Sequence, residues 1–129
     1  MTSFEDIADQ LDHQAIELPS WAFGNSGTRF KVFSTPGTPR TVQEKLADAA
    51  QVHKVTGLAP KVALHIPWDR VDDYAALKVN AADLGLALGT INSNTFQDDL
   101  YKFGSLTHVD DSVRRKAIDH HFELSLIHI

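Results

Sequence analysis

Two hydrophobic patterns alternate along this chain of 129 residues. Apolar residues recurring every three or four positions are typical of amphipathic helices, and short continuous apolar runs are typical of buried strands. The predicted helices cover residues 3–16, 41–57, 72–85 and 110–122. The predicted strands cover residues 20–23, 62–66, 86–91 and 124–129. This alternation predicts an α/β fold with a parallel sheet and right-handed crossovers.

Polar residues and glycines at the predicted helix ends support these boundaries. Ser3 is a candidate N-cap of the first helix, and Thr41 with Glu44 has the spacing of a capping box. Gly57 is suited to end the second helix, because glycine readily adopts the left-handed conformation. Asp72 is a candidate cap of the third helix.

The order of elements fits part of a (β/α)8 barrel. A complete barrel needs about 250 residues, so this chain has room for three βα units and the start of a fourth strand. We divide the chain into an N-terminal helical extension, residues 1–18, and the N-terminal part of a truncated barrel domain, residues 19–129.

Composition narrows the classes of partner and compartment. The net charge is −5, which argues against nucleic acid or an anionic membrane as a partner, since both favour clustered Lys and Arg. The chain has no cysteine, which excludes disulfides and thiolate metal sites within it. No apolar run reaches the roughly 20 residues of a membrane span, and the acidic N-terminus does not resemble a signal peptide. A cytoplasmic location is expected.

Candidate chemistry gathers where the predicted strands end, which is where barrel enzymes build their sites. The residues at or just after these strand ends are Trp21, His65, Trp68, Asp69, Asn92, Asn94 and Phe96. Aromatic rings suit the C–H faces of a sugar, while imidazole, carboxylate and amide groups suit its hydroxyls. The pattern therefore indicates a carbohydrate site.

Structural interpretations compete with this one. A histidine on an apolar strand, such as His65, is often a core residue with satisfied nitrogens, and Trp21, Trp68 and Phe96 are often core or rim packing. His120 and His121 are adjacent on a predicted helix, so their side chains point about 100° apart and indicate a helix surface rather than a metal site.

Five short blocks resemble one known family, the L-rhamnose isomerases and sugar isomerases of broad substrate range. The blocks are Pro19-Ser20-Trp21, Gly27-Thr28-Arg29-Phe30, Leu64-His65-Ile66-Pro67-Trp68-Asp69, Asn92-Ser93-Asn94-Thr95-Phe96 and Lys102-Phe103-Gly104-Ser105-Leu106-Thr107-His108. They occur in the order and spacing of the N-terminal part of that family, over about residues 16–123.

The resemblance implies a TIM barrel of the xylose-isomerase type, two Mn²⁺-class ions, a homotetramer, and an aldose–ketose isomerase of rhamnose catabolism. A divalent cation would stabilise the charge that builds on the sugar oxygens when hydrogen moves between C1 and C2. Oxygen donors with histidine suit Mn²⁺. In the family the metal ligands lie on later strands, so we assign none here and expect them beyond residue 129.

Carried over residue by residue, the resemblance implies that Trp21, His65, Trp68 and Phe96 line the substrate pocket. His65 would contact the sugar near its reacting end and is the candidate catalytic residue. The loop of residues 24–40, which contains Phe30, resembles the family loop that reaches into the site of a neighbouring subunit. An aldose or ketose is the expected ligand.

Two alternatives remain open at this point. One is a non-catalytic carbohydrate-binding or interaction module with a self-contained core. The other is a different metal enzyme of the same barrel type, such as an apurinic endonuclease, against which the acidic charge argues. Under the isomerase interpretation, the isolated chain is expected to be inactive, because half a barrel leaves open strand edges and lacks the metal ligands.

Overall fold

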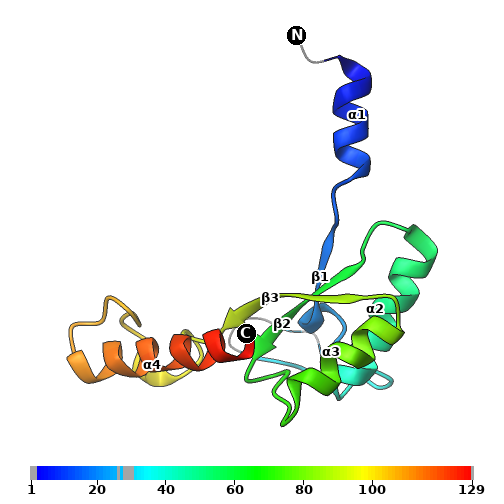
Figure 1. Ribbon diagram of the computed structural model, residues 1–129. Coiled ribbons are helices and arrows are strands. Elements are labelled where there is room, and N and C mark those ends of the chain that lie inside the picture. Colours follow the sequence, from blue (N-terminus) through cyan, green and yellow to red (C-terminus); the bar gives the residue numbers. More distant parts are fainter. Residues whose placement is uncertain (1–2, 26, 28–30, 129) are drawn as a thin grey trace.

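A computed structural model describes residues 3–25, 27 and 31–128, and it contains one small parallel sheet with helices around it (Figure 1). The strands are β1 (Glu17–Pro19), β2 (Lys61–Ile66) and β3 (Ala87–Ser93), in the spatial order β1-β2-β3. Both neighbouring pairs are parallel. The strands are thus parallel and flanked by helices, an α/β-like arrangement, and the partial (β/α)8 barrel stays a prediction.

Helices connect and flank these strands. They are α1 (Phe4–Asp12), α2 (Val42–Thr56), α3 (Tyr74–Asp83) and α4 (Asp111–His128), with short 3-10 turns η1 (Ser20–Ala22) and η2 (Asp99–Tyr101). None of the helices in the described ranges has the length and apolar character that a bilayer crossing requires.

The main core lies between the sheet and the pair α2 and α3, which cover one face of it (Figure 1). Its buried members are apolar residues of β2 and of the two helices, with Leu86 at the start of β3: Val42, Leu46, Ala49, Val62, Leu64, Leu77, Ala81 and Leu86. A second, smaller cluster joins η2 to α4. The core thus fixes the strand ends against two helices.

Helix ends follow the sequence closely. Both predicted N-caps are confirmed: Ser3 and Thr41 each form a capping box with the residue three positions on. Gly57 ends α2 with φ of +71°, as expected for a left-handed C-cap. The third helix is capped by Asp73 instead of Asp72, because the Asp73 side chain accepts the amide hydrogen of Ala76.

Two predicted strands are wrong. Residues 20–22 form the turn η1, and the strand lies just before them at Glu17–Pro19, where it pairs with Lys61–Ala63. The chain turns after Pro19 because the Ser20 hydroxyl donates a hydrogen bond to Asp69 across the end of β2. The first strand is therefore shorter and earlier than the apolar run suggested.

The second error concerns the predicted fourth strand at 124–129. Residues 124–128 continue helix α4, and residue 129 lies outside the described part of the chain. Val113, Ala117 and Leu124 are all buried and share one helix face, so their packing favours the helix over the local β-propensity of the tail.

A carboxylate ties the two outer strands together across β2. Thr90 of β3 donates two hydrogen bonds to Glu17 of β1, from its amide (2.6 Å) and its hydroxyl (2.8 Å). A Cβ at Gly89 would lie 1.5 Å from Glu17 Oε1, so this position must be glycine for the contact to form. The register of β2 and β3 shifts between Val62 and Leu64, which is where this contact occurs.

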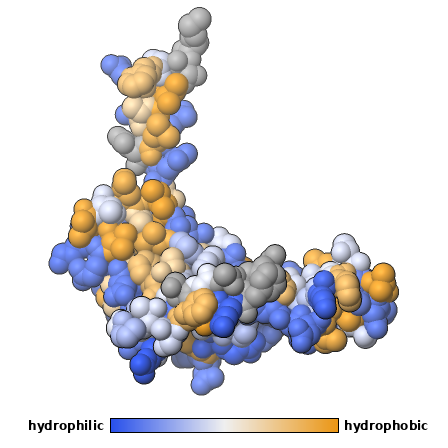
Figure 2. Space-filling model, turned by 180° about the vertical axis from the view of Figure 1, so that it is seen from behind, coloured by the Kyte–Doolittle hydropathy of each residue, from blue (hydrophilic) through white to orange (hydrophobic). Residues whose placement is uncertain are grey.

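Helix α1 stands apart from the rest of the molecule (Figure 1). Phe4, Ile7 and Leu11 are 85%, 46% and 59% exposed, and Figure 2 shows hydrophobic side chains along one side of the projecting helix. In a soluble protein such a stripe is normally packed against another element.

Candidate functional site

The site is centred on His65, near the carboxyl end of β2. Its ring stacks on Trp68, with ring centres 3.8 Å apart and planes inclined by 19°. Trp21 and Phe96 meet the same ring edge-on, at 5.6 and 5.9 Å. The structure thus brings together the four residues that the sequence predicted at the ends of three successive strands. Their contact with a sugar remains a prediction.

The His65 imidazole is buried but has unused hydrogen-bonding capacity. The residue is 4% exposed, and neither ring nitrogen has a hydrogen-bond partner within the described part of the chain. Leaving a buried polar atom unpaired costs about 1–3 kcal/mol. A ligand that offers both a donor and an acceptor to this ring would recover that free energy.

The surroundings of His65 favour its neutral form. Burial lowers the pKa of the imidazole, and the negative charge of Asp69 opposes this effect in part. A neutral imidazole carries one donor nitrogen and one acceptor nitrogen. It can therefore donate to one hydroxyl and accept from another, as recognition of a polyol requires.

The aromatic rings around His65 are partly open to solvent. Trp21 is 36% exposed and Trp68 is 42% exposed. Exposed aromatic faces beside a buried polar group are the combination that binds an apolar ring face and orients its hydroxyls.

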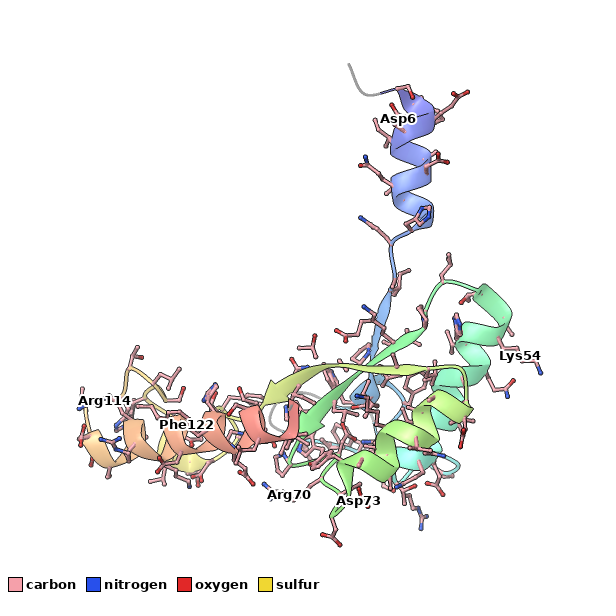
Figure 3. The ribbon with its side chains drawn as sticks, in the orientation of Figure 1. Asp6, Lys54, Arg70, Asp73, Arg114 and Phe122 are labelled. Carbon is pink, nitrogen blue, oxygen red and sulfur yellow. The ribbon has the colours of Figure 1, made fainter. Side chains whose placement is uncertain are left out.

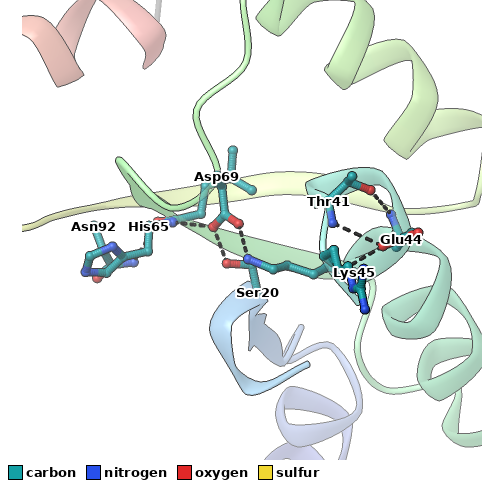
Figure 4. Close-up of polar contacts among 9 residues, drawn as sticks. Ser20, Thr41, Glu44, Lys45, His65, Asp69 and Asn92 are labelled. Atoms are coloured by element: carbon teal, nitrogen blue, oxygen red, sulfur yellow. Dashed lines mark hydrogen bonds and ion pairs between the residues drawn. The ribbon is translucent and has the colours of Figure 1, made fainter. Parts of the chain in front are cut away.

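Asp69 does not face this site, contrary to the expectation that its carboxylate would suit sugar hydroxyls. It is 1% exposed and accepts hydrogen bonds from the Ser20 hydroxyl, the His65 amide (2.8 Å) and the Lys45 ammonium (2.6 Å) (Figure 4). These partners belong to η1, β2 and α2. One buried carboxylate therefore holds together the segments that carry Trp21, His65 and Trp68.

Lys45 is a residue of this network that was not predicted from the sequence. It lies on the buried face of α2, between Val42 and Ala49, and is 7% exposed. A lysine on the apolar stripe of an amphipathic helix is rare unless it has a charged partner, so its position was a usable signal.

The two asparagines predicted to bind hydroxyls are already engaged with protein groups. The Asn92 side chain donates to the carbonyl of Leu64 (3.3 Å). The Asn94 side chain donates to Gln97 Oε1 (2.7 Å) and accepts from the Gln97 amide (3.3 Å). Both amides thus stabilise the end of β3 and the turn that leads to Phe96.

The adjacent residues His120 and His121 were both predicted to lie on a helix surface, and for His120 this is wrong. Its side chain is 16% exposed, and its Nε2 accepts the amide hydrogen of Asn94 (3.2 Å). His121 instead contacts the carbonyl of Ala117 on its own helix (2.7 Å). The side chains of adjacent helical residues diverge as expected, and one of them points at the strand ends.

A metal centre is not formed by the residues that the structure describes. Over residues 3–25, 27 and 31–128, no group of three or more histidine and carboxylate side chains is placed to hold an ion. Phe30, with Thr28 and Arg29 of the same block, lies outside the described residues. On the described part of that loop, Val32 and Phe33 are 51% and 54% exposed.

The chain is similar to two curated proteins, although it matches no family profile. It is 42% identical to a probable sugar isomerase of Rhizobium meliloti, over 93% of the chain and 32% of that protein. It is 40% identical to a probable sugar isomerase of Mesorhizobium japonicum, over 94% of the chain and 29% of that protein.

The chain therefore spans about a third of the length of the curated relatives that it matches. Its similarity to these probable sugar isomerases extends over nearly all of its own length.

Proposed function

We propose that this chain is part of a metal-dependent aldose–ketose isomerase that converts L-rhamnose to L-rhamnulose and acts on related sugars. In this proposal it forms one wall of the substrate site. The observation that carries the proposal is the buried His65 ring, which lies among Trp21, Trp68 and Phe96 and whose nitrogens have no hydrogen-bond partner among the residues that the structure describes. The similarity to probable sugar isomerases supports the same class of substrate.

In this proposal the chain binds and orients the sugar. The rings of Trp21 and Trp68 pack against its C–H face, and neutral His65 exchanges hydrogen bonds with hydroxyls near the reacting carbon atoms. The Asp69 network keeps the three segments in register while the ligand enters. His65 is then placed to assist ring opening or to relay a proton.

The metal ions of the proposed enzyme do not fit the described residues, which offer no suitable group of ligands. We expect two Mn²⁺-class ions held by residues beyond position 129, and no step is assigned to them here. The three parallel strands in sequence order are compatible with the first units of a TIM barrel. A homotetramer, with Phe30 reaching a neighbouring site, completes the proposal.

Tryptophan fluorescence tests the sugar site directly. The chain has two tryptophans, Trp21 and Trp68, and both adjoin His65. We expect titration with L-rhamnose to change their emission saturably, and H65A to abolish the change. The exposed Phe103 offers a control, because F103A should titrate like the unaltered chain. An unaltered chain whose emission does not respond to L-rhamnose or related aldoses would contradict the proposal.

Two further observations separate substrate binding from catalysis. We expect no turnover of L-rhamnose by the isolated chain, with or without Mn²⁺, and measured turnover would overturn the placement of the metal ligands. The genomic sequence downstream of codon 123 should continue in frame to Glu, Asp and His residues at the ends of later strands. A reading frame without them would refute the isomerase.

A carbohydrate-binding module is the second candidate. It is favoured by one observation, which is that the buried His65 ring lies beside the partly exposed rings of Trp21 and Trp68, an arrangement that suits binding without turnover equally well. A cooperative thermal transition that L-rhamnose shifts upward in the absence of metal would favour this alternative. The downstream sequence would then lack the expected ligands.

A further inference from the structure

Helix α4 contributes a contact to the site that lies outside the His65 cluster. His120 reaches from α4 to the end of β3, where its Nε2 accepts the backbone amide hydrogen of Asn94 (3.2 Å). Asn94 stands two residues before Phe96, whose ring meets His65 edge-on. The position of the Phe96 ring therefore depends on the side chain of His120.

The contact fixes the protonation state of His120. Because Nε2 accepts a hydrogen bond, it carries no proton in this arrangement, and the proton of the neutral ring lies on Nδ1. Nδ1 is 3.5 Å from Glu123 Oε2. Glu123 is in turn 2.5 Å from Arg70, and this contact lowers the pKa of the carboxyl group.

The residues form one connected chain around the site. It runs from Asn94 through His120 and Glu123 to Arg70, which follows Trp68 and Asp69 in the sequence. Figure 3 shows Arg70 near the C-terminal half of α4, which carries Phe122. The end of β3, helix α4 and the segment after β2 are thus linked by these contacts.

We propose that His120 is a positioning residue that holds the segment 94–96 against His65 only while its Nε2 is unprotonated. Protonation makes both ring nitrogens donors, so the Asn94 amide loses its acceptor and faces a cation. The segment is then released, and the site binds sugar less tightly at low pH. The sugar-binding half of this inference rests on the proposed function, and the positioning half does not.

Several charged or titratable groups face His120. Glu123 lies on its own helix, Arg70 follows β2, and His121 is its neighbour, with ring centres 6.2 Å apart. His65 of β2 lies within electrostatic range of it. The contact with Arg70 lowers the pKa of the Glu123 carboxyl group, so its negative charge persists at mildly acidic pH. Protonation of His65, whose ring contacts Phe96 directly, would produce a similar pH dependence. The test must separate these two histidines.

The first measurement needs no ligand. In ¹⁵N–¹H correlation spectra recorded from mildly alkaline to mildly acidic pH, the Asn94 amide signal should move together with the ring signals of His120, because both report the same hydrogen bond. In H120Q the glutamine Oε1 can accept the same hydrogen bond and does not titrate, so the Asn94 signal should stay nearly constant. An Asn94 signal that is insensitive to pH in the unaltered chain, or that moves equally in H120Q, overturns the proposal.

The second measurement uses L-rhamnose with tryptophan emission as the readout. The unaltered chain should bind about five-fold more weakly at the acidic end, which is the effect of losing one ordinary hydrogen bond. H120Q should keep most of its affinity there, and H120A should bind weakly at both ends of the range. Equal pH dependence in H120Q and the unaltered chain would assign the effect to His65 and overturn the sugar-binding half.

The Asn94 amide signal and the binding of L-rhamnose test different halves of the proposal, so one can fail while the other holds. If L-rhamnose does not bind at any pH, the proposed function fails, and the Asn94 signal still decides whether His120 positions the segment. If H120A does not fold, the comparison of H120Q with the unaltered chain carries both halves of the test.

Discussion

Within the part of the chain that the structure describes, the side chain of His65 is buried without the hydrogen bonds that usually accompany the burial of a polar group. The imidazole has left water, but none of the described residues gives its ring nitrogens a hydrogen-bond partner. The sequence predicted the group of residues around it, because strand ends in a parallel sheet meet at one edge. It did not predict that the ring would be unpaired, since that depends on the placement of every neighbouring side chain.

The lowered pKa of His65 gives a prediction about stability. The folded state disfavours the charged ring, so its contribution to stability is present above about pH 6.5, the unfolded value, and is lost as the pH falls toward the lower folded value. H65F removes this titration. The urea midpoint of the unaltered chain should fall more between pH 7.5 and pH 5.5 than that of H65F, and equal falls would contradict the prediction.

Asp69 gives a second prediction at the same scale. D69N leaves the buried Lys45 ammonium without a counter-charge, and breaking a buried pair in this way costs roughly 3–5 kcal/mol. D72N is the matched control, because Asp72 is exposed and does not cap α3. Urea unfolding at neutral pH should distinguish the two variants clearly. K45M combined with D69N should recover part of the loss, and no recovery would argue against the ion pair as its cause.

Among the elements, those with local signals were predicted well. Capping boxes and the glycine after α2 depend on residues a few positions apart, so the chain itself specifies them. The errors at residues 20–23 and 124–128 have another origin. There the outcome depends on distant partners, namely Asp69 for the turn after β1 and the packed face of α4 for the tail.

The tail of α4 can be tested by substitution. Leu124 is 7% exposed, whereas Phe122 on the same helix is 66% exposed. L124A should destabilise the chain by about 2–4 kcal/mol, the usual cost of removing a buried leucine side chain, and F122A should have little effect. Urea unfolding followed by far-ultraviolet circular dichroism measures both. Similar losses for the two variants would contradict the packed position of Leu124.

In the whole molecule, the sheet packs against helices α2 and α3, whereas α1 and α4 bury less of their surface. Helix α1 projects with its apolar stripe exposed, and α4 extends from the sheet in a different direction (Figure 1). Neither the projection of α1 nor the tie between the outer strands could be predicted, because both are long-range features.

The tie between Glu17 and Thr90 gives a prediction for the whole sheet. G89A places a methyl group where the Glu17 carboxylate lies, so it should destabilise the chain by about 1–3 kcal/mol. G24A is the control, since its Cβ would meet only ordinary contacts. E17A removes the clashing group, so G89A should cost much less in an E17A background. Additive losses in this double-mutant cycle would refute the clash.

The same tie has a consequence for how the chain is made. Its partners are 73 positions apart, so the first strand must wait for most of the chain before the contact can form. Loop-closure entropy makes such distant contacts slow to form, and synthesis proceeds at roughly 5–20 residues per second. Thr90 follows the end of β2 by 24 positions, so on the ribosome about 1–5 s separate the completion of β2 from the first possible contact between Glu17 and Thr90.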